Sequence, residues 1–451
     1  METSPILAHY RKNLRLALPI VAGNLGHMLV TLADSIMVGQ VGTVPLAAAS
    51  LANSIFMVVL AAGLGVSFGI TPLVAAADGR GHTNRFARLL TNSLVVYTAT
   101  GVLLFIVIFS VSRFIHFLDQ PPEVAALAVP YLNIIMLSLV PLMIFQSCKQ
   151  FAEGLSLTSQ AMIIVLGASL LNVVLNYILI FGHLGFPALG LNGAGWATLI
   201  SRVLMAAAMA GFLALPAIVK RYRLSFSFRN YSGILVSKLL KLGVPIGMQM
   251  TFEVGAFAGA AVIIGWLGAQ ELAAHQIALT LAATTYMMAQ GLAAAATVRV
   301  GNQLGLRNYH ELRKAVFSIY QMVIFFMGFM AVFFILGRNW LPAFFVESAE
   351  VISIASGLLI IAGLFQLFDG MQVTGLGALR GMEDVTIPTA ITLIAYFVIG
   401  LPGGYILAFP LGMGVNGMWM GLLSGLGTAA LFLTWRFHLK SKARLVSQPS
   451  E

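Results

Sequence analysis

Three carboxylic acids stand inside apolar runs that are long enough to cross a membrane: Asp34, Glu253 and Asp369. A charged side chain at the centre of a bilayer costs at least about 2.5–3.5 kcal/mol, which a neutral side chain would avoid. A carboxyl group in such a medium is stable when it is protonated, bound to Na⁺ or paired with another cation. Because these states exclude one another, we expect cations to exchange at the three acids.

Exchange of this kind is the chemistry of an antiporter, in which inward H⁺ or Na⁺ displaces a bound organic cation. The membrane potential supplies about 2.3 kcal/mol per charge per 100 mV. The sequence has no GxxxxGK[ST] motif, so coupling to ATP on this chain is not expected. It also has no clustered His and Cys and no nucleophile motif. We therefore expect no enzymatic activity and no cofactor besides the coupling ion.

Polar side chains recur at helical spacing beside two of the acids. Gln249 lies one turn before Glu253. Gln366 and Gln372 flank Asp369 at intervals of three residues, so the three side chains share one helix face. This pattern predicts a polar cavity around a cation-coupling pair, Glu253 and Asp369, which would also be the ligands if the ion is Na⁺.

Other residues complete the predicted cavity. Phe365 lies one turn from the acid in its span, and Tyr286 and Met287 lie in the eighth apolar run. Methionine suits a pocket that must fit many shapes. In the fifth run Asn172 and Asn176 are four residues apart and share a helix face.

Structural roles are the alternatives for these polar residues. Membrane asparagines often bond across helices, so Asn172 and Asn176 could clamp two helices together. Asp34 could be an interfacial residue near the end of its helix. Glu253 and Asp369 could be structural ion pairs. No intramembrane lysine is available to them, and Arg202, the basic residue deep in a span, is expected to act within the first half of the chain.

Composition places the whole chain in a membrane. It has 451 residues, of which 59% are hydrophobic and 9% charged, whereas a soluble domain carries about a quarter charged residues. We therefore predict an all-α polytopic membrane protein, because the runs are continuously apolar and do not alternate as barrel strands do. Twelve spans are expected, near residues 14–38, 45–77, 89–111, 124–148, 160–183, 191–215, 236–266, 271–301, 315–337, 351–379, 386–409 and 412–436.

The distribution of lysine and arginine predicts the orientation. With the N-terminus in the cytoplasm, the outer loops hold only Arg113 and Arg338, and the other basic clusters fall inside. Both termini are therefore expected in the cytoplasm. The net charge of +10 is explained by these loops, so no nucleic-acid partner is expected. Membrane lipids are the expected surroundings, and the chain is expected to be a monomer; the resemblance described below implies a bacterial inner membrane.

The two halves of the chain resemble each other at a shift of 226 residues. Pro19 then aligns with Pro245, and Gly65 with Gly291. We predict two lobes of six spans each, at residues 1–218 and 236–451, joined by a basic cytoplasmic linker at 219–235. Because each half has an even number of spans, a pseudo-twofold axis along the membrane normal should relate the lobes. This geometry suits alternating access.

Six segments together resemble the multidrug and toxic compound extrusion (MATE) family, in its bacterial NorM-type branch, over about residues 8 to 440. These segments are "LADSIMVGQVG", "LLNVVLNY", "QMTFEVGAFA", "ELAAHQIA", "GNQLG" and "DGMQVTGLGALRG". The resemblance implies two six-helix lobes and export of cationic, amphipathic drugs against Na⁺ or H⁺, and hence antibiotic resistance.

The resemblance also implies two sites. A cation site in the second lobe would use Glu253 and Asp369, and a polar site in the first lobe would use Asp34, Asn172 and Asn176. Many relatives have a tyrosine where this chain has a phenylalanine at position 365, and the missing hydroxyl favours a proton over a sodium ion. A flippase for a lipid-linked amphiphile is the alternative function, since related two-lobe folds move such substrates.

Overall fold

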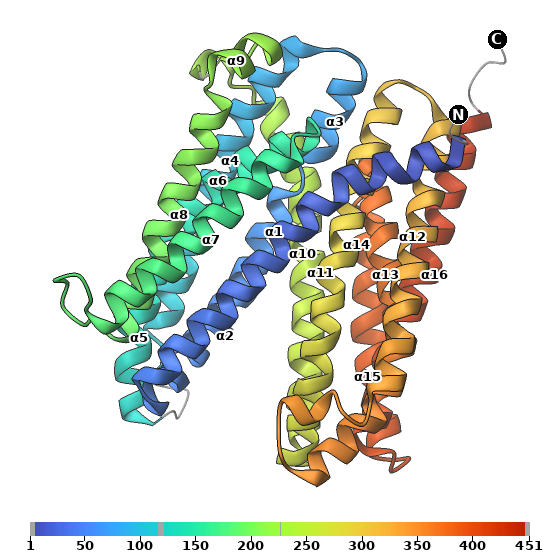
Figure 1. The fold of residues 1–451 in the computed structure, drawn as a ribbon. Coiled ribbons are helices and arrows are strands. Elements are labelled where there is room, and N and C mark those ends of the chain that lie inside the picture. The colour runs from blue at the N-terminus through green and yellow to red at the C-terminus, as the bar shows by residue number, and fades with distance from the viewer. Residues whose placement is uncertain (1–4, 116–120, 226, 447–451) are drawn as a thin grey trace. The chain divides into compact units, whose positions relative to one another are not determined.

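The chain is helical throughout the part that the computed structural model describes, residues 5–115, 121–225 and 227–446, and these ranges contain no strand (Figure 1). Twelve segments in these ranges are long and apolar enough to cross a membrane, and each overlaps one of the predicted spans. The prediction of an all-α, twelve-span membrane protein is therefore confirmed.

Helices of the first half of the chain are α1 (Pro5–Val41), α2 (Thr43–Ser67), α3 (Thr71–Gly79), η1 (Thr83–Arg85), α4 (Phe86–Ser112), α5 (Pro122–Leu137), α6 (Leu139–Gly154), α7 (Thr158–Phe181), α8 (Leu191–Leu213), α9 (Pro216–Tyr222) and η3 (Phe228–Asn230). Those of the second half are α10 (Gly233–Gly265), α11 (Ala269–Gly305), α12 (Tyr309–Gly337), η4 (Pro342–Phe344), α13 (Ala349–Gly381), α14 (Thr386–Leu393), the π-helix η5 (Ile394–Gly400), α15 (Leu401–Ala408) and α16 (Gly414–Val446).

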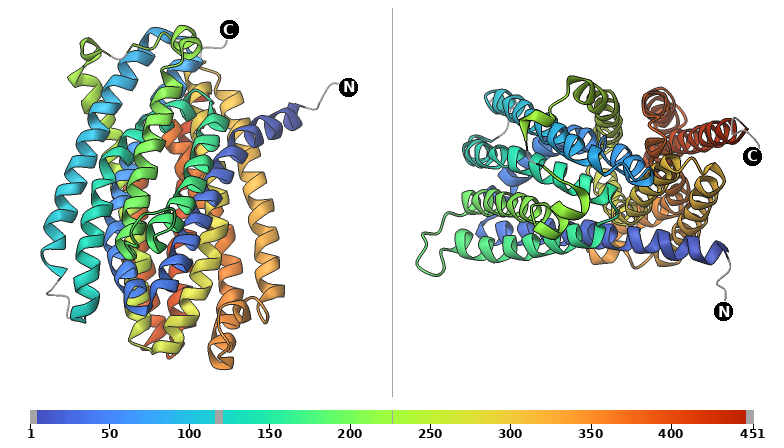
Figure 2. Two further views of the ribbon diagram at one scale, coloured as in Figure 1. Left: turned by 60° about the vertical axis from the view of Figure 1, so that its left-hand side comes forward. Right: turned by 90° about the horizontal axis from the view of Figure 1, so that it is seen from above.

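Packing divides the chain into two compact units. The N-terminal unit comprises residues 22–247. The C-terminal unit comprises the described residues up to Val21 together with those from Met248 onward. In the N-terminal unit α6 packs on α4 and α8, and α7 packs on α8; in the C-terminal unit α13 packs on α11, α12 and α16. Figure 2 shows the same helices from two further directions.

The helices α1 and α10 each contribute to both units. In the C-terminal unit the first half of α1 lies against Gly291, where an added Cβ would be 3.2 Å from Val21 N. In the N-terminal unit the start of α10 lies against Gly65, where an added Cβ would be 2.5 Å from Gly247 Cα. Both pairs of positions are separated by 226 residues. The two units therefore repeat one close backbone contact, which supports the duplication.

A second equivalent pair is Gly42 and Gly268, which precede α2 and α11. Their φ angles are 151° and 155° and their ψ angles 168° and 166°, a conformation open only to glycine. The division at residues 218 and 236 follows this duplication and stays a prediction, because the packing units change instead between Val21 and Ala22 and between Gly247 and Met248.

The π-helix η5 is held against α16 by glycines. A Cβ at Gly421 would lie 2.2 Å from Gly404 Cα on α15 and 2.7 Å from the carbonyl oxygen of Gly400 at the end of η5, and one at Gly425 would lie 2.4 Å from the carbonyl oxygen of Ala395 on η5. Small residues at four-residue intervals let membrane helices approach this closely. This contact fixes the height and rotation of η5, which carries Tyr396.

We expect Gly421→Ala to destabilise the C-terminal unit, because its methyl group would overlap the backbone of α15. Overpacking of this kind costs about 1–3 kcal/mol. The matched control is Gly403→Ala on α15, where an added Cβ meets no atom within 4 Å. Thermal unfolding of the purified variants in detergent should show a lower midpoint for Gly421→Ala only. Equal midpoints would contradict the close contact.

Candidate functional site

The two acids of the second half lie together inside the C-terminal unit. Glu253 on α10 is 9% exposed and Asp369 on α13 is 4% exposed. The ionised forms of the two carboxyl groups repel each other electrostatically. The structure therefore places the predicted pair within mutual reach in a buried position, where both side chains cannot remain ionised without positive charge nearby.

Arg380, in the last turn of α13, supplies such a charge. Its Nη2 donates to Gln249 Oε1 at 2.8 Å, the Gln249 side chain is hydrogen-bonded to Glu253, and the guanidinium attracts Glu253. From the sequence, no lysine within the spans was available to these acids, and the structure brings an arginine from a helix end within electrostatic range of Glu253. Arg380 lies at a helix end, but side chains on a helix point back towards its N-terminus, so this one extends towards the span.

The charges in this group do not balance. Two carboxylates and one guanidinium leave one negative charge when all three are ionised. The guanidinium of Arg380 attracts Glu253, and the charge of Glu253 repels that of Asp369. The group can therefore bind one further positive charge, and Asp369 is the acid with the greater need of it.

Two tyrosine hydroxyls belong to the same group. The hydroxyl of Tyr396 on η5 donates to Gln372 Oε1 at 3.0 Å, and the side chain of Tyr286 on α11 is hydrogen-bonded to Gln290. Both tyrosines interact electrostatically with the two acids. The structure thus brings the predicted residues Tyr286 and Gln372 to the acids.

The remaining predicted residues of this half lie in other surroundings. Gln366 is buried and accepts a hydrogen bond from Thr285 Oγ1 at 2.5 Å. Phe365 packs in an apolar cluster, with ring centroids 6.1 Å from Phe257 and 5.7 Å from Trp419. Met287 follows Tyr286 on α11 and is half-buried. Their predicted roles in substrate binding stay predictions.

The polar residues of the first half meet in the N-terminal unit. Asn176 on α7 donates through Nδ2 to Asp34 on α1 and to Asn172 Oδ1, the latter at 3.2 Å. Both asparagines are buried and Asp34 is half-buried. Because one amide joins the acid to the second asparagine, the three predicted residues form one hydrogen-bonded group.

Arg202 on α8 balances this group, as its position in the sequence predicted. The guanidinium attracts Asp34, donates to Ser138 Oγ at 2.6 Å and lies 5.1 Å from the centroid of the Phe56 ring. Ser138 separates α5 from α6. One carboxylate and one guanidinium leave no net charge here, in contrast to the acids of the C-terminal unit.

Comparison with known proteins identifies the family. The family model described as MatE matches residues 19–178 and 245–406. The chain belongs to the MATE family. The probable multidrug resistance protein NorM of Rhizobium meliloti is 36% identical over 434 residues, which cover 95% of this chain and 93% of that protein. The multidrug resistance protein MdtK of Yersinia pseudotuberculosis is 32% identical over 437 residues, which cover 96% of each.

Solved structures share the MATE fold. The eukaryotic MATE transporter AtDTX14 superposes with a TM-score of 0.89 at 20% identity, covering 97% of this chain and 98% of that one. A MOP superfamily transporter from Pyrococcus furiosus superposes equally well at 21% identity, covering 98% and 99%. These likenesses support the two-lobe, multi-pass membrane fold.

Two members of this MATE protein's acid group were missed from the sequence. Arg380 lies one residue beyond the predicted span 351–379, and its position in "LRG" at the end of that span was the signal that could have found it. Tyr396 lies in the apolar run "ITLIAYFVIG", where nothing in the spacing indicates a π-helix. Such helices are frequent at functional sites.

We predict that Arg380→Gln increases the reaction of Glu253 with a carbodiimide, which modifies protonated carboxyl groups. Without the guanidinium an ionised Glu253 would be buried and uncompensated, so its neutral form is favoured. The control Arg380→Lys keeps the positive charge and should label as the wild type does. Labelling is measured by peptide mass spectrometry. Equal labelling in all three proteins would show that Arg380 does not stabilise the carboxylate.

Proposed function

We propose that this MATE protein exports cationic amphipathic drugs across the bacterial inner membrane by antiport against an inward cation, through alternating access. The observation that carries the proposal is the net negative charge of Glu253, Asp369 and Arg380. A single additional cation neutralises the group, so an inward ion and a drug cation compete for it. Each displaces the other, which couples their movements.

The comparisons support the drug substrate. Relatives more than 30% identical over nearly the whole chain are called multidrug resistance proteins. The excess of lysine and arginine in alternate loops between the spans supports both termini in the cytoplasm. We further propose that the protein works as a monomer, since each unit holds its own polar group.

We propose H⁺ as the coupling ion in preference to Na⁺. Sodium needs several oxygen ligands, but the side-chain amide oxygens beside the acids already accept hydrogen bonds. Gln249 Oε1 accepts from Arg380 Nη2, and Gln372 Oε1 accepts from the hydroxyl of Tyr396. Phe365 adds no hydroxyl. A proton needs only the carboxyl group.

A flippase for an anionic, lipid-linked amphiphile is the alternative. Arg202 and Arg380 are half-buried cations that such a substrate could use. However, Asp34 balances the first, and the two acids outweigh the second. The charge count therefore favours a cationic substrate.

Transport in proteoliposomes tests the proposal. We expect an outward-directed flux of ethidium to be driven by an imposed pH gradient, and not by a sodium gradient at constant pH. Glu253→Gln and Asp369→Asn should each lower the flux at least ten-fold, because the neutral side chains cannot exchange a cation. Asp34→Asn should lower the ethidium flux by a smaller factor than these two substitutions do. The matched control is Glu347→Gln, an exposed acid between α12 and α13.

Three results would contradict the proposal. The first is equal flux in the wild type and in both variants of the acid pair. The second is flux driven by neither gradient. The third is movement of anionic lipid instead of ethidium, which would favour the flippase. A flux driven by sodium alone would retain antiport and overturn the choice of H⁺.

A further inference from the structure

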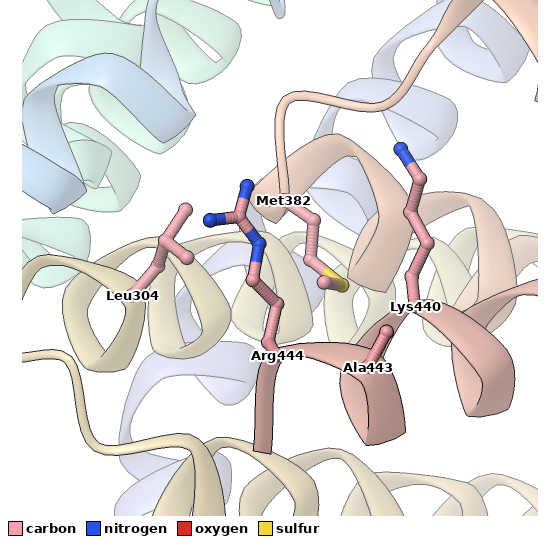
Figure 3. Close-up of a pocket in the computed structure, with 5 residues that line it drawn as sticks. All are labelled: Leu304, Met382, Lys440, Ala443 and Arg444. Atoms are coloured by element: carbon pink, nitrogen blue, oxygen red, sulfur yellow. The ribbon is translucent and has the colours of Figure 1, made fainter. Parts of the chain in front are cut away.

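A pocket separate from the acid group lies where the ends of α11, α13 and α16 meet. Its volume is about 350 Å³, and it is lined by Leu304, Met382, Lys440, Ala443 and Arg444. Figure 3 shows Lys440 and Arg444 extending from α16 to the same side of the helix. Because they are four residues apart, the two cations lie one above the other on one face.

The length of α16 places this pocket at the surface of a membrane. The helix has 33 residues, which at 1.5 Å per residue extend about 50 Å, well beyond the ~30 Å hydrocarbon layer. Trp435 is 59% exposed and packs edge-to-face on Phe432. Exposed tryptophans mark the membrane–water interface. Lys440 and Arg444 follow one to three turns later, at the depth of lipid phosphates.

A network of ion pairs fixes the cations beside the pocket. The buried Asp384 accepts from Arg436 Nε at 2.7 Å and Nη2 at 3.1 Å, and from Lys440 Nζ at 2.9 Å. Together with Arg436 and Lys440, Arg444 makes three cations around the pocket. The carboxylates of Asp384 and its neighbour Glu383 offset two of them. The surroundings therefore carry one net positive charge, and Lys440 is held in place by its bond to Asp384.

We propose that this pocket binds the phosphate of an anionic phospholipid, of the phosphatidylglycerol type. Lysine and arginine bind phosphate through charge-assisted hydrogen bonds, and basic pockets between the ends of membrane helices suit anionic head groups. Leu304, Met382 and Ala443 provide an apolar wall for the glycerol and the first methylenes. The ammonium of a zwitterionic lipid would instead meet cations of like charge.

The same phosphate chemistry could come from a soluble anion, but the position of the pocket favours a lipid. A soluble phosphate gains nothing from an apolar wall, whereas a lipid adds the burial of methylenes at about 0.8 kcal/mol each. The site requires neither the drug nor the coupling ion. Its place in the cytoplasmic leaflet follows from the proposed orientation.

Native mass spectrometry of the full chain in detergent tests this site. We expect phosphatidylglycerol to bind in preference to phosphatidylethanolamine. Arg444→Gln should weaken phosphatidylglycerol binding about five-fold, the effect of one basic residue near a membrane surface. Ala443→Phe should weaken it by filling the pocket without a change of charge. The control is Lys442→Gln, an exposed residue on the same helix that does not line the pocket, and binding should be unchanged.

The midpoint of thermal unfolding without lipid shows whether a variant is folded as stably as the wild type. Lipid binding is compared only between proteins with equal midpoints. Loss of the lipid preference in Arg444→Gln and Ala443→Phe, with Lys442→Gln unaffected, supports the site. Equal retention of phosphatidylglycerol in all variants overturns it. Stabilisation by inorganic phosphate, without preference between the lipids, overturns the assignment to a lipid.

Discussion

A carboxylate inside a membrane must have positive charge beside it or take up a proton, and this constraint organises both units of the protein. In the N-terminal unit Arg202 attracts Asp34 and Asn176 donates to it. In the C-terminal unit Arg380 attracts Glu253. Asp369 is repelled by the negative charge of Glu253. The proposed antiport rests on this imbalance, because two carboxylates share one guanidinium.

The fold brings these groups together through close backbone contacts. Glycines at equivalent positions of the two halves, Gly65 and Gly291, let the starts of α10 and α1 pack against the opposite repeat's helices. Glycines of α16 hold the π-helix η5, and this positions the hydroxyl of Tyr396 beside Gln372. Without these contacts the hydroxyls and amides could not surround two buried acids.

Much of this arrangement could be predicted from the sequence. Hydrophobic runs give the twelve spans, because an apolar segment that crosses lipid must form a helix to hydrogen-bond its own backbone polar groups. The spacing of Asn172 and Asn176 gives a shared helix face, and lone acids in apolar runs point to the candidate site. These predictions depend on properties of single segments, which periodicity and hydropathy report directly.

Features that depend on contacts between two or more segments were harder to predict. The reach of Arg380 depends on the direction of its side chain and on the helix that lies opposite. The placement of Tyr396 depends on a π-helix whose sequence resembles any apolar run. The packing of Phe365 on Phe257 and Trp419 requires three helices at once. None of these contacts can be predicted from the spacing of residues within one span.

The most direct test of the account is the number of protons released when a drug cation binds. Ethidium would be titrated into the purified protein in weakly buffered detergent near neutral pH, with proton release followed by an indicator dye. The account predicts release of about one proton per ethidium bound, because one positive charge replaces another. It also predicts that Asp369→Asn abolishes the release. Ethidium binding without release of any cation, or unchanged release in Asp369→Asn, would contradict it.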